Sequence, residues 1–462
     1  MTRSWVEIPE NSDFTLDNLP YGVFSTSSRP PRCGVAIGNL VLDLSVVTCL
    51  LRGIGGLDPS CFSKPALNEF MACPSSVWKA TRERLMDLLR EGGSRELRDD
   101  PVMASKAFVK LDTVKMHLPA VIPDYTDFYS SRDHAFNCGC MFRDPANALQ
   151  PNWLHLPVGY HGRASTVFVS GTEIVRPRGQ LQKDKGDPKK GSEYGPCKNL
   201  DFEMEIAFFV GGEPLRLGET ITMDNVEDRI FGLVLMNDWS ARDIQSWEYV
   251  PLGPFGSKNF ATSISPWIVP YEALKPFTCE TISRVQQDPE PLDYLKDPNY
   301  SSFDIDLTVS IQGQDMPQAE QVCRTNMRNL YWNIKQQLVH HTVTGCRMRP
   351  GDLLGTGTIS GGEQDSLGSL LEMSWRGTRD VPLGSSGENR KFLKDFDKVI
   401  MRGKCQNKAR SSLLAPLLKV IQRTSTWNKR YLQLTECHKL RLWGQDDFTL
   451  GSFTVIRFYY TH

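Results

Sequence analysis

Residues 200–210 carry the pattern that most restricts how this chain can fold. Their sequence, LDFEMEIAFFV, places Asp201, Glu203 and Glu205 at every second position. Successive side chains of a β-strand point to opposite faces, so a strand here puts the three acids on one face, about 7 Å apart. Ionised carboxylates in such a row repel one another unless water screens them or a cation neutralises them. The pattern alone leaves two interpretations open, a solvated strand face and a metal site.

Two further acids favour the metal site. Asp238 directly follows the apolar run at residues 231–237, which is typical of a buried strand that ends in a polar residue, and a buried carboxylate needs a partner. Asp127 lies in a predicted loop, residues 124–134, that also holds His134. Since no thiolates or paired histidines stand at metal-ligand spacing, oxygen ligands would select Mg²⁺ or Ca²⁺. Taken alone, a histidine in such a loop is more often structural than a catalytic base.

A third cluster occupies residues 237–258. Arg242, Gln245 and Tyr249 recur at intervals of three and four, so one helical turn would place them on one face, which lines a pocket or faces solvent. The glycine-rich residues 355–362, GTGTISGG, do not have the spacing of a dinucleotide-binding loop. We expect a tight loop there.

The chain has 462 residues, two to three times a typical domain, so we expect at least two hydrophobic cores. Strand signals separated by Gly and Pro dominate residues 119–406, and residues 1–118 form a separate unit with a helix capped near Ser75. The fold class is predicted to be mainly β with a minor α component. The predicted strands are 21–26, 35–37, 40–44, 166–169, 202–210, 231–236, 305–311 and 370–375, with a helix at 327–340 and surface loops at 183–198 and 286–302.

Charge and composition exclude several classes of function. Lys and Arg number 53 against 54 Asp and Glu, so the net charge of −1 gives no broad attraction for nucleic acid. Near the centre, the longest apolar run, residues 230–236, is far shorter than the roughly 20 residues of a membrane span. Glu7, Glu10 and Asp13 precede any apolar stretch, which argues against a signal peptide. The twelve cysteines are scattered, so we expect reduced thiols and a cytoplasmic protein.

Residues 407–462 differ in character from the rest. They hold nine Lys or Arg and three Asp or Glu, while the first 406 residues carry a net charge of −7. Within this basic tail, residues 413–421 are predicted as a short helix interrupted at Pro416, and residues 453–460 have strand composition.

With these motifs the chain resembles the fumarylacetoacetate hydrolase family, over residues 13–406. The resemblance is densest at residues 18–26, 124–134, 154–165, 237–254 and 351–361. It implies an SH3-like barrel in residues 1–118, a β-roll catalytic domain in residues 119–406, and a homodimer. The implied activity is metal-dependent cleavage of a C–C bond in a 3,5-diketo acid: fumarylacetoacetate gives fumarate and acetoacetate, the last step of tyrosine and phenylalanine degradation.

The resemblance also assigns roles to residues of this chain. It implies His134 as the base that activates water, Glu372 as the carboxylate that orients it, and Arg242, Gln245 and Lys258 as groups that stabilise the departing carbanion. The implied ligands of Ca²⁺ or Mg²⁺ are Asp127, Glu203, Glu205 and Asp238, and a second Mg²⁺ site falls on Lys258, Ala261 and Thr262 with Asp238. Ala261 replaces the glycine of the family. The implied substrate contacts are Tyr129, Arg143, Tyr160, Gln245, Tyr249 and Thr358.

Two other functions compete with this one. A decarboxylase or hydratase of 2-oxo acids belongs to the same superfamily, but the N-terminal barrel and the loop at residues 124–134 argue against it. A catalytically impaired variant that only binds metal or dimerises is suggested by the tail, because the family has a short glycine-rich closing strand after residue 406 and residues 407–462 do not resemble one. Either the tail packs loosely with little effect, or a sheet edge is left unpaired.

Overall fold

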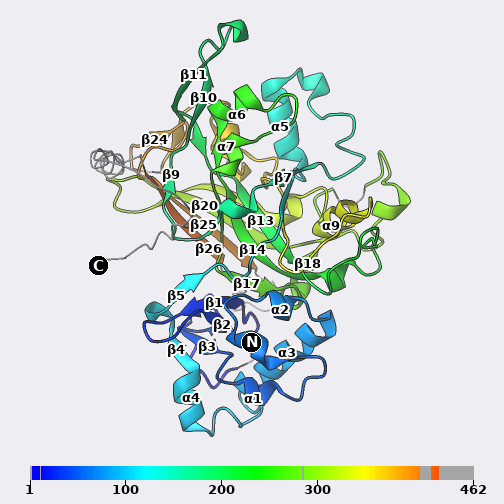
Figure 1. The fold of residues 1–462 in the computed structure, drawn as a ribbon. Coiled ribbons are helices and arrows are strands. Elements are labelled where there is room, and N and C mark those ends of the chain that lie inside the picture. Colours follow the sequence, from blue (N-terminus) through cyan, green and yellow to red (C-terminus); the bar gives the residue numbers. More distant parts are fainter. Residues whose placement is uncertain (1–2, 11, 284–285, 385, 406–417, 426–462) are drawn as a thin grey trace, which may run out of the picture. The chain divides into compact units, whose positions relative to one another are not determined.

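The computed structural model describes residues 3–10, 12–283, 286–384, 386–405 and 418–425. They all lie in one unit, Met1–Ser425. The N-terminal part pairs five strands and carries four helices beside them (Figure 1). The strands are β1 (Tyr21–Ser25), β2 (Arg32–Ile37), β3 (Leu40–Asp43), β4 (Phe108–Lys110) and β5 (Lys115–His117), and the helices are α1 (Thr48–Leu51), α2 (Asn68–Met71), α3 (Ser75–Leu89) and α4 (Pro101–Ala107).

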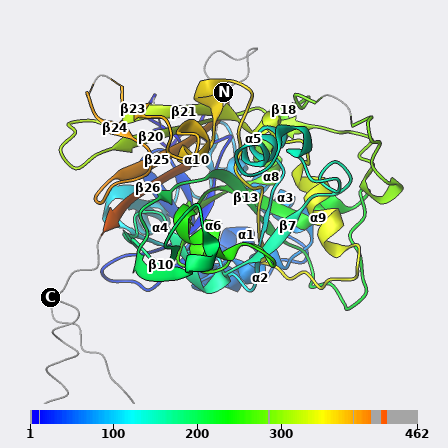
Figure 2. The same cartoon turned by 90° about the horizontal axis from the view of Figure 1, so that it is seen from above.

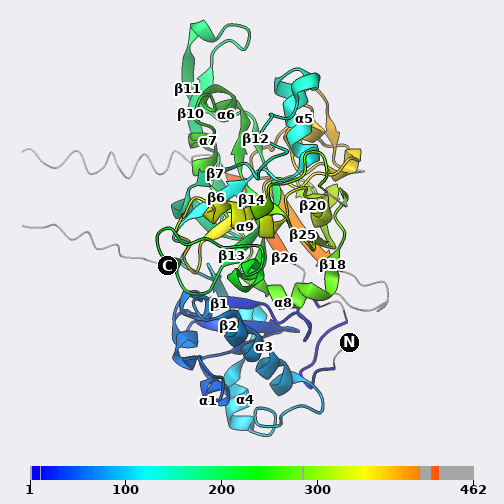
Figure 3. The same cartoon turned by 90° about the vertical axis from the view of Figure 1, so that its right-hand side faces the viewer.

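A single 13-stranded sheet joins this N-terminal part to the rest of the chain. Strand β1 pairs antiparallel with β17 (Trp267–Pro270), with Tyr21 opposite Ile268. Beyond β17 the sheet order is β14 (Ile230–Asp238), β13 (Met204–Val210), β22 (Leu353–Gly355), β6 (Tyr125–Phe128) and β7 (Gly159–Gly162), with β16 (Thr262–Ile264) on β14 and β8 (Val167–Val169) on β16. Figure 3 shows β6, β7, β13 and β14 in this later part of the chain, where β22 lies between β13 and β6. The first 118 residues are therefore tied to the later part by main-chain pairing.

The central strands have no solvent face. Every residue of β13 and β14 is buried. Alternate side chains enter two different hydrophobic clusters: Phe208 and Leu235 belong to one, and Phe209 and Val234 to the other. Because both faces are covered, β14 reads as a continuous apolar run.

A second sheet of five strands has the order β21 (Glu320–Asn326), β20 (Ile305–Gln312), β25 (Lys398–Cys405), β26 (Leu418–Ser425) and β9 (Ile174–Val175). Figure 2 shows β20, β25 and β26 side by side. Strand β26 comes from the basic tail and pairs antiparallel along β25, from Lys398 opposite Arg423 to Gly403 opposite Leu418. Within the described residues, β25 has a neighbour on each side, so the unpaired edge, one of the two alternatives considered for the tail, is not found there.

The remaining elements are short. The two-stranded pairs are β10 (Arg178–Gln182) with β11 (Ser192–Pro196), β12 (Leu200–Asp201) with β15 (Ser240–Ala241), β18 (Thr278–Cys279) with β19 (Ser302–Phe303), and β23 (Val381–Pro382) with β24 (Asn389–Arg390). The helices are α5 (Arg132–Phe142), α6 (Arg242–Glu248), α7 (Gly256–Asn259), α8 (Tyr271–Leu274), α9 (Ile334–Thr342) and α10 (Leu370–Met373).

Several expectations from the sequence are corrected by these elements. Residues 370–375 were predicted as a strand, but Leu370–Met373 is a helix because the Ser369 side chain accepts the Glu372 N–H and caps it. The predicted loop at residues 183–198 contains β11, and the predicted helix at residues 327–340 begins only at Ile334, where Asn333 caps it.

Two more corrections concern helix ends and the tail. Helix α3 begins at Ser75 as predicted, but its N-cap is Pro74 and no serine side chain caps it. In the tail, residues 418–421 are strand where a helix was predicted, and the predicted strand at residues 453–460 lies outside the described residues. The mainly β fold class is confirmed. No helix among the described residues is long and apolar enough to span a bilayer.

Candidate active site

Four acidic side chains meet across the strands β14, β13, β22 and β6, which follow one another in the large sheet. Asp127 comes from β6, Glu203 directly precedes β13, Glu205 lies in β13, and Asp238 ends β14. One ligand atom of each lies within 4.8 Å of the others, and all four residues are buried. Strand pairing produces this meeting, since β13 pairs with β14 and with β22, which in turn pairs with β6. The solvated strand face, the alternative left open by the sequence, is excluded for these acids.

Two carboxylate oxygens of the acidic cluster lack a hydrogen-bond partner. Oδ1 of Asp127 and Oε1 of Glu205 are buried with no hydrogen-bond partner. A buried carboxylate oxygen without a partner costs free energy unless a proton or a cation occupies it. Oxygen atoms only, gathered from four carboxylates, fit a hard divalent cation such as Mg²⁺ or Ca²⁺. The residues present therefore fit the metal that the sequence predicts.

Burial and mutual repulsion separate the pKa values of the four acids. Burial first, and then the charge of Asp238, raises the pKa of Asp127 to about 8. Burial and the neighbouring acids raise the pKa of Glu205 well above its usual value. Burial also works to raise the pKa of Glu203, but Lys258 and Arg242 outweigh it and lower that pKa to about 2. Glu203 is thus neutralised by cations of the chain, whereas Asp127 and Glu205 need a proton or a metal.

Gly355 allows Asp127 and Glu205 to approach each other. It lies opposite Asp127 in the β6–β22 pairing. A Cβ atom at this position would lie 2.9 Å from Oδ1 of Asp127 and 3.1 Å from Oε2 of Glu205. Both distances are tighter than ordinary carbon–oxygen contacts, so a larger residue would push the carboxylates apart. The glycine-rich segment thus serves the acidic cluster rather than a nucleotide.

Asp201 leaves the row that the sequence predicted. The strand is interrupted at Phe202 and Glu203, so Asp201 belongs to β12 and points elsewhere. Its carboxylate accepts Nε of Arg242 at 2.9 Å and the backbone N–H groups of Leu370 and Leu371 at 2.8 and 2.9 Å. It therefore joins Arg242 to the first turn of α10.

His134 is held by a carboxylate from a distant part of the chain. Its Nδ1 lies 2.7 Å from Oε2 of Glu372. That oxygen also accepts the hydroxyls of Ser360 and Ser369, both at 2.9 Å, and Oε1 accepts Asn137 Nδ2 at 3.0 Å. His134 lies in the first turn of α5, not in a loop as predicted. Although burial works to lower the pKa of His134, the charges of Cys138 and Glu372 raise it well above its usual value.

Two cations of the chain lie against the acidic cluster. Nζ of Lys258 lies 2.6 Å from Oδ2 of Asp238 and also contacts Glu203. Nη2 of Arg242 lies 2.8 Å from Oε1 of Glu203, and its Nη1 donates to Oε1 of Gln245 at 3.2 Å. Both cations are buried, so their charges act through little water.

The residues predicted for a second metal surround Asp238. Thr262 donates its hydroxyl to Oδ1 at 2.7 Å, while Oδ2 accepts Lys258 and the hydroxyl of Tyr160, the latter at 2.9 Å. Ala261 is buried beside them. Both oxygens of Asp238 already have partners within the chain, which distinguishes this position from Asp127 and Glu205.

A cavity of about 810 Å³ opens onto these groups. Among the predicted residues it is lined by Asp127, Tyr129, His134, Arg143, Tyr160, Glu203, Glu205, Arg242, Gln245, Tyr249, Lys258 and Thr358. The other four predicted residues, Asp238, Ala261, Thr262 and Glu372, lie behind this lining. The predicted substrate contacts thus share one cavity with the acidic cluster and the imidazole.

Two family models match successive parts of the chain. Residues 17–119 match the family model of the fumarylacetoacetase N-terminal region, and residues 125–409 match that of the fumarylacetoacetate hydrolase C-terminal region. The chain belongs to the fumarylacetoacetase family. The fumarylacetoacetases of Bos taurus and Homo sapiens are 55% and 54% identical over 405 residues, which cover 87% of this chain and 94% of theirs. That of Caenorhabditis elegans is 52% identical over 406 residues, covering 87% of this chain and 95% of its own length.

Sequence reasoning missed several residues of this fumarylacetoacetase-family site. Cys138, Lys185, Lys198 and Arg376 line the cavity, and Asp201, Ser360 and Ser369 hold the groups behind it. Cys138 stands four residues after His134, a spacing that brings side chains together on a helix, but residues 132–142 were not predicted to be helical. The others come from parts of the chain distant from His134 in sequence, and only the tertiary fold brings them to the site.

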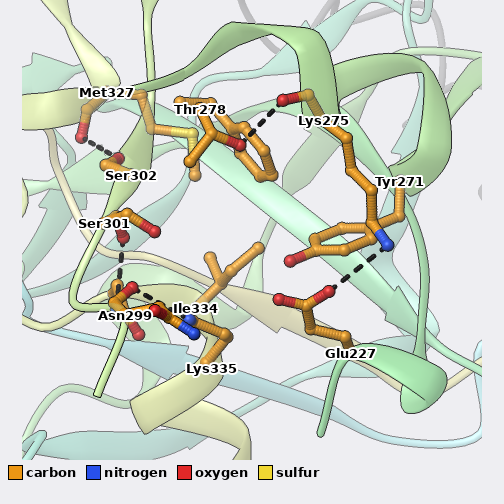
Figure 4. Close-up of a pocket in the computed structure, with 12 residues that line it drawn as sticks. Glu227, Tyr271, Lys275, Thr278, Asn299, Ser301, Ser302, Met327, Ile334 and Lys335 are labelled. Atoms are coloured by element: carbon orange, nitrogen blue, oxygen red, sulfur yellow. Dashed lines mark hydrogen bonds and ion pairs between the residues drawn. The ribbon is translucent and has the colours of Figure 1, made fainter. Parts of the chain in front are cut away.

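A second, smaller cavity of about 230 Å³ lies between α8, α9 and the start of β19 (Figure 4). Its charged groups are paired with one another. Lys335 lies 2.7 Å from Asp297 and donates to the carbonyl of Asn299 at 3.2 Å, and Lys275 lies 3.4 Å from Glu227. These pairs leave no free charge to attract a ligand.

Proposed function

We propose that this protein catalyses the metal-dependent hydrolysis of fumarylacetoacetate to fumarate and acetoacetate, the last step of tyrosine and phenylalanine degradation. One observation carries the proposal. A buried cluster of four carboxylates and an imidazole oriented by a buried carboxylate face one cavity, in a chain more than half identical to fumarylacetoacetases over most of its length.

His134 acts as the base in this proposal. Nδ1 is occupied by Glu372, so Nε2 is the nitrogen that takes a proton from water. The resulting hydroxide attacks the ketone carbonyl carbon of the fumaroyl group, and the π electron pair moves to the carbonyl oxygen, which becomes an oxyanion. Glu372 keeps the ring in position and stabilises the imidazolium that forms, as the orienting acid does in other base-assisted hydrolases.

Expulsion of the acetoacetate carbanion is the demanding step, because carbon is a poor leaving group unless its charge is delocalised and neutralised. The residues assigned to this step are Lys258, Arg242 and Gln245. The charged groups of Lys258 and Arg242 are buried and paired with carboxylates before substrate binds, so they need little rearrangement. A divalent cation held by Asp127, Glu203, Glu205 and Asp238 would add Lewis-acid stabilisation of the negative charge.

The substrate carries two terminal carboxylates, and the proposal assigns their binding to Arg143 and to the tyrosines Tyr129, Tyr160 and Tyr249, with Thr358 and Gln245 as further contacts. Guanidinium groups suit carboxylates because they donate two parallel hydrogen bonds. All six residues line the cavity.

The cation is proposed to be Ca²⁺ or Mg²⁺, since the ligands are carboxylate oxygens. A second Mg²⁺ is proposed at Lys258, Ala261 and Thr262 with Asp238. Ala261 in place of the family's glycine leaves its backbone carbonyl available. The oxygens of Asp238 would then have to exchange partners from within the chain for the metal.

The finer organisation is proposed from the family. Residues 1–118 form an SH3-like barrel, residues 119–406 a catalytic β-roll domain, and residues 407–462 an atypical tail, in a homodimer located in the cytoplasm. The pairing of β1 with β2 and β5, of β2 with β3 and of β3 with β4 supports the barrel.

The catalytically impaired alternative is not favoured, because the groups proposed for catalysis lie together and β26 pairs with β25. The test is consumption of fumarylacetoacetate by the full chain, with and without EDTA. We expect turnover that EDTA abolishes and that is lost in His134→Ala while cation binding persists. A folded, metal-loaded protein without turnover would overturn the proposal, and activity retained by His134→Ala would remove His134 as the base.

A further inference from the structure

A thiol lies against the imidazole of His134. Cys138 follows it by one turn of α5, and Sγ of Cys138 lies 3.7 Å from Nε2 and 3.9 Å from Nδ1. Since Nδ1 is bonded to Glu372, Nε2 is the nitrogen that can accept the thiol proton. Cys138, His134 and Glu372 thus have the arrangement of an activated nucleophile: a thiol, a base beside it, and an acid that orients the base.

The thiol can be reached from the cavity. Cys138 is half-buried and belongs to the lining of the 810 Å³ cavity, together with Arg143 at the end of the same helix. Cys140 is half-buried as well but does not belong to the cavity lining, in keeping with its position two residues further along the helix. Cys49, in α1, is exposed. Comparing the reactivity of these three thiols therefore distinguishes the effect of solvent exposure from the effect of the neighbouring imidazole.

We propose that Cys138 is a covalent modification site for electrophiles that carry an alkene conjugated to a carbonyl group. The fumaroyl group belongs to this class, so the inference rests on the proposed function for its natural electrophile. Arg143 in the same cavity suits the carboxylate at the end of such a group.

The reaction is a conjugate addition and needs no further reactant. The thiol gives its proton to Nε2 of His134, and the sulfur electron pair forms a bond to the alkene carbon that lies β to the carbonyl. The π electrons of the alkene move to the carbonyl as an enolate, which takes a proton from the imidazolium at the α carbon. One S–H and one C=C bond are replaced by one C–S and one C–H bond, with no leaving group and no change in redox state.

The consequence is self-inactivation. A thioether on Cys138 fills the space next to the base and excludes water from it. Each encounter with substrate then ends either in hydrolysis or, more rarely, in an adduct, so activity is lost in proportion to the number of turnovers.

The first experiment uses monomethyl fumarate, which has the conjugated carbonyl and one carboxylate, and needs no turnover. The full metal-loaded chain is incubated with it, and the cysteine peptides are quantified by mass spectrometry. We expect the adduct on Cys138 to form at least tenfold faster than on exposed Cys49 or on Cys140, and to slow at least tenfold in His134→Ala. Labelling that follows exposure, with Cys49 first, or an adduct rate unchanged in His134→Ala, would overturn the proposal.

The second experiment follows hydrolysis over many turnovers in Cys138→Val and Cys140→Val, two matched substitutions on one helix. We expect the progressive loss of activity to disappear in Cys138→Val and to persist in Cys140→Val. If the native chain hydrolyses the substrate but gains no adduct, the proposed modification fails and the function stands. If Cys138 is labelled by monomethyl fumarate but no hydrolysis occurs, the function fails and the modification stands.

Discussion

Glu372 is, after Cys138, the residue whose charge raises the pKa of the proposed base His134. The charge of this carboxylate favours the imidazolium form, so it helps to raise the pKa of His134 against the effect of burial. A base is active only when deprotonated, and a raised pKa moves the acidic limb of the pH–rate profile to higher pH. A divalent cation bound by the acidic cluster would have the opposite effect, because its positive charge disfavours the imidazolium and so lowers the pKa of His134.

Glu372→Gln tests this role. We expect the acidic limb of kcat/KM to move to lower pH, because the neutral amide no longer favours the imidazolium. The plateau should fall by about a hundredfold or more, because the imidazolium formed in the transition state loses its counter-charge. Asn137→Ala, which removes only the contact to Oε1, serves as the control and should move the limb little. A limb that stays in place in Glu372→Gln would contradict this assignment.

Lys258→Met tests the buried cation. The methionine side chain keeps most of the length of lysine but has no charge, so the developing negative charge loses one fixed donor. Such a loss costs about 3 to 4 kcal/mol of transition-state stabilisation, so kcat should fall by roughly a hundredfold or more. The measurement is kcat at saturating substrate, with cation binding followed separately by calorimetry. A variant that binds the cation and keeps its kcat would show that Lys258 only balances the charge of Glu203 and Asp238.

Residues of the site were predictable where a local pattern carried them. Glu203, Glu205 and Asp238 stood out because acids on a strand face or at a strand end are costly without a partner, and Asp127 stood out because it shares a polar segment with His134. The link between His134 and Glu372 spans 238 positions and had no local signal, so it entered only through the family resemblance. Asp201 does not join the acidic cluster, because the strand is interrupted between β12 and β13. Hydrophobic periodicity does not reveal this interruption.

At the scale of elements, hydrophobic periodicity predicted the long buried strands correctly. It failed for a short helix whose start is determined by a capping side chain. The apolar runs of β13, β14 and β20 were found because burial on at least one face leaves a clear pattern. Helix α10 was predicted as a strand, since four residues are too few for a helical period and only the Ser369 cap marks its start. Helix α5 has 11 residues, but its buried positions are His134, Ala135, Gly139 and Met141, which give no clear apolar period, so part of it was taken for a loop.

Strand β26 is the element with the most direct bearing on the tail. It pairs six residues with β25 and two with β9, and so lies inside the five-stranded sheet. Val420, opposite Met401, is in the middle of this pairing. Proline in an interior strand removes an N–H group from the ladder and is poorly tolerated there.

We therefore expect Val420→Pro to lower the melting temperature by about one degree for each kcal/mol of stability lost, and Val420→Thr, which keeps strand propensity, to change it little. The measurement is thermal unfolding followed by circular dichroism. Equal melting temperatures for the proline variant and the native chain would show that this part of the tail contributes nothing to the sheet.

At the scale of the whole molecule, the acidic cluster links folding to pH and to metal. Without a cation, burial holds the pKa of Asp127 at about 8, and that of Glu205 is raised in the same direction. The folded chain then keeps protons that the unfolded chain releases above about pH 4, the usual range of a carboxylic acid. Because the folded state binds more protons in this window, its free energy of unfolding falls as pH rises from about 4 to about 8.

A bound divalent cation replaces those protons and removes their contribution to the pH dependence. We therefore expect the melting temperature in EDTA to decrease from about pH 5.5 to about pH 8, and the increase produced by saturating Mg²⁺ or Ca²⁺ to be largest at the upper end. At a cation concentration of a hundred times Kd the stabilisation amounts to about 2.7 kcal/mol.

Glu203 and Glu372, whose pKa values are lowered, contribute stability that is lost only as pH falls below the usual range of a glutamic acid, so they do not obscure this window. Asp127→Asn provides the matched control, because it removes one raised carboxyl without changing the shape of the side chain. It should flatten the decline in EDTA and weaken the cation effect, and a metal-induced increase that is the same at both pH values in the native chain would contradict the linkage.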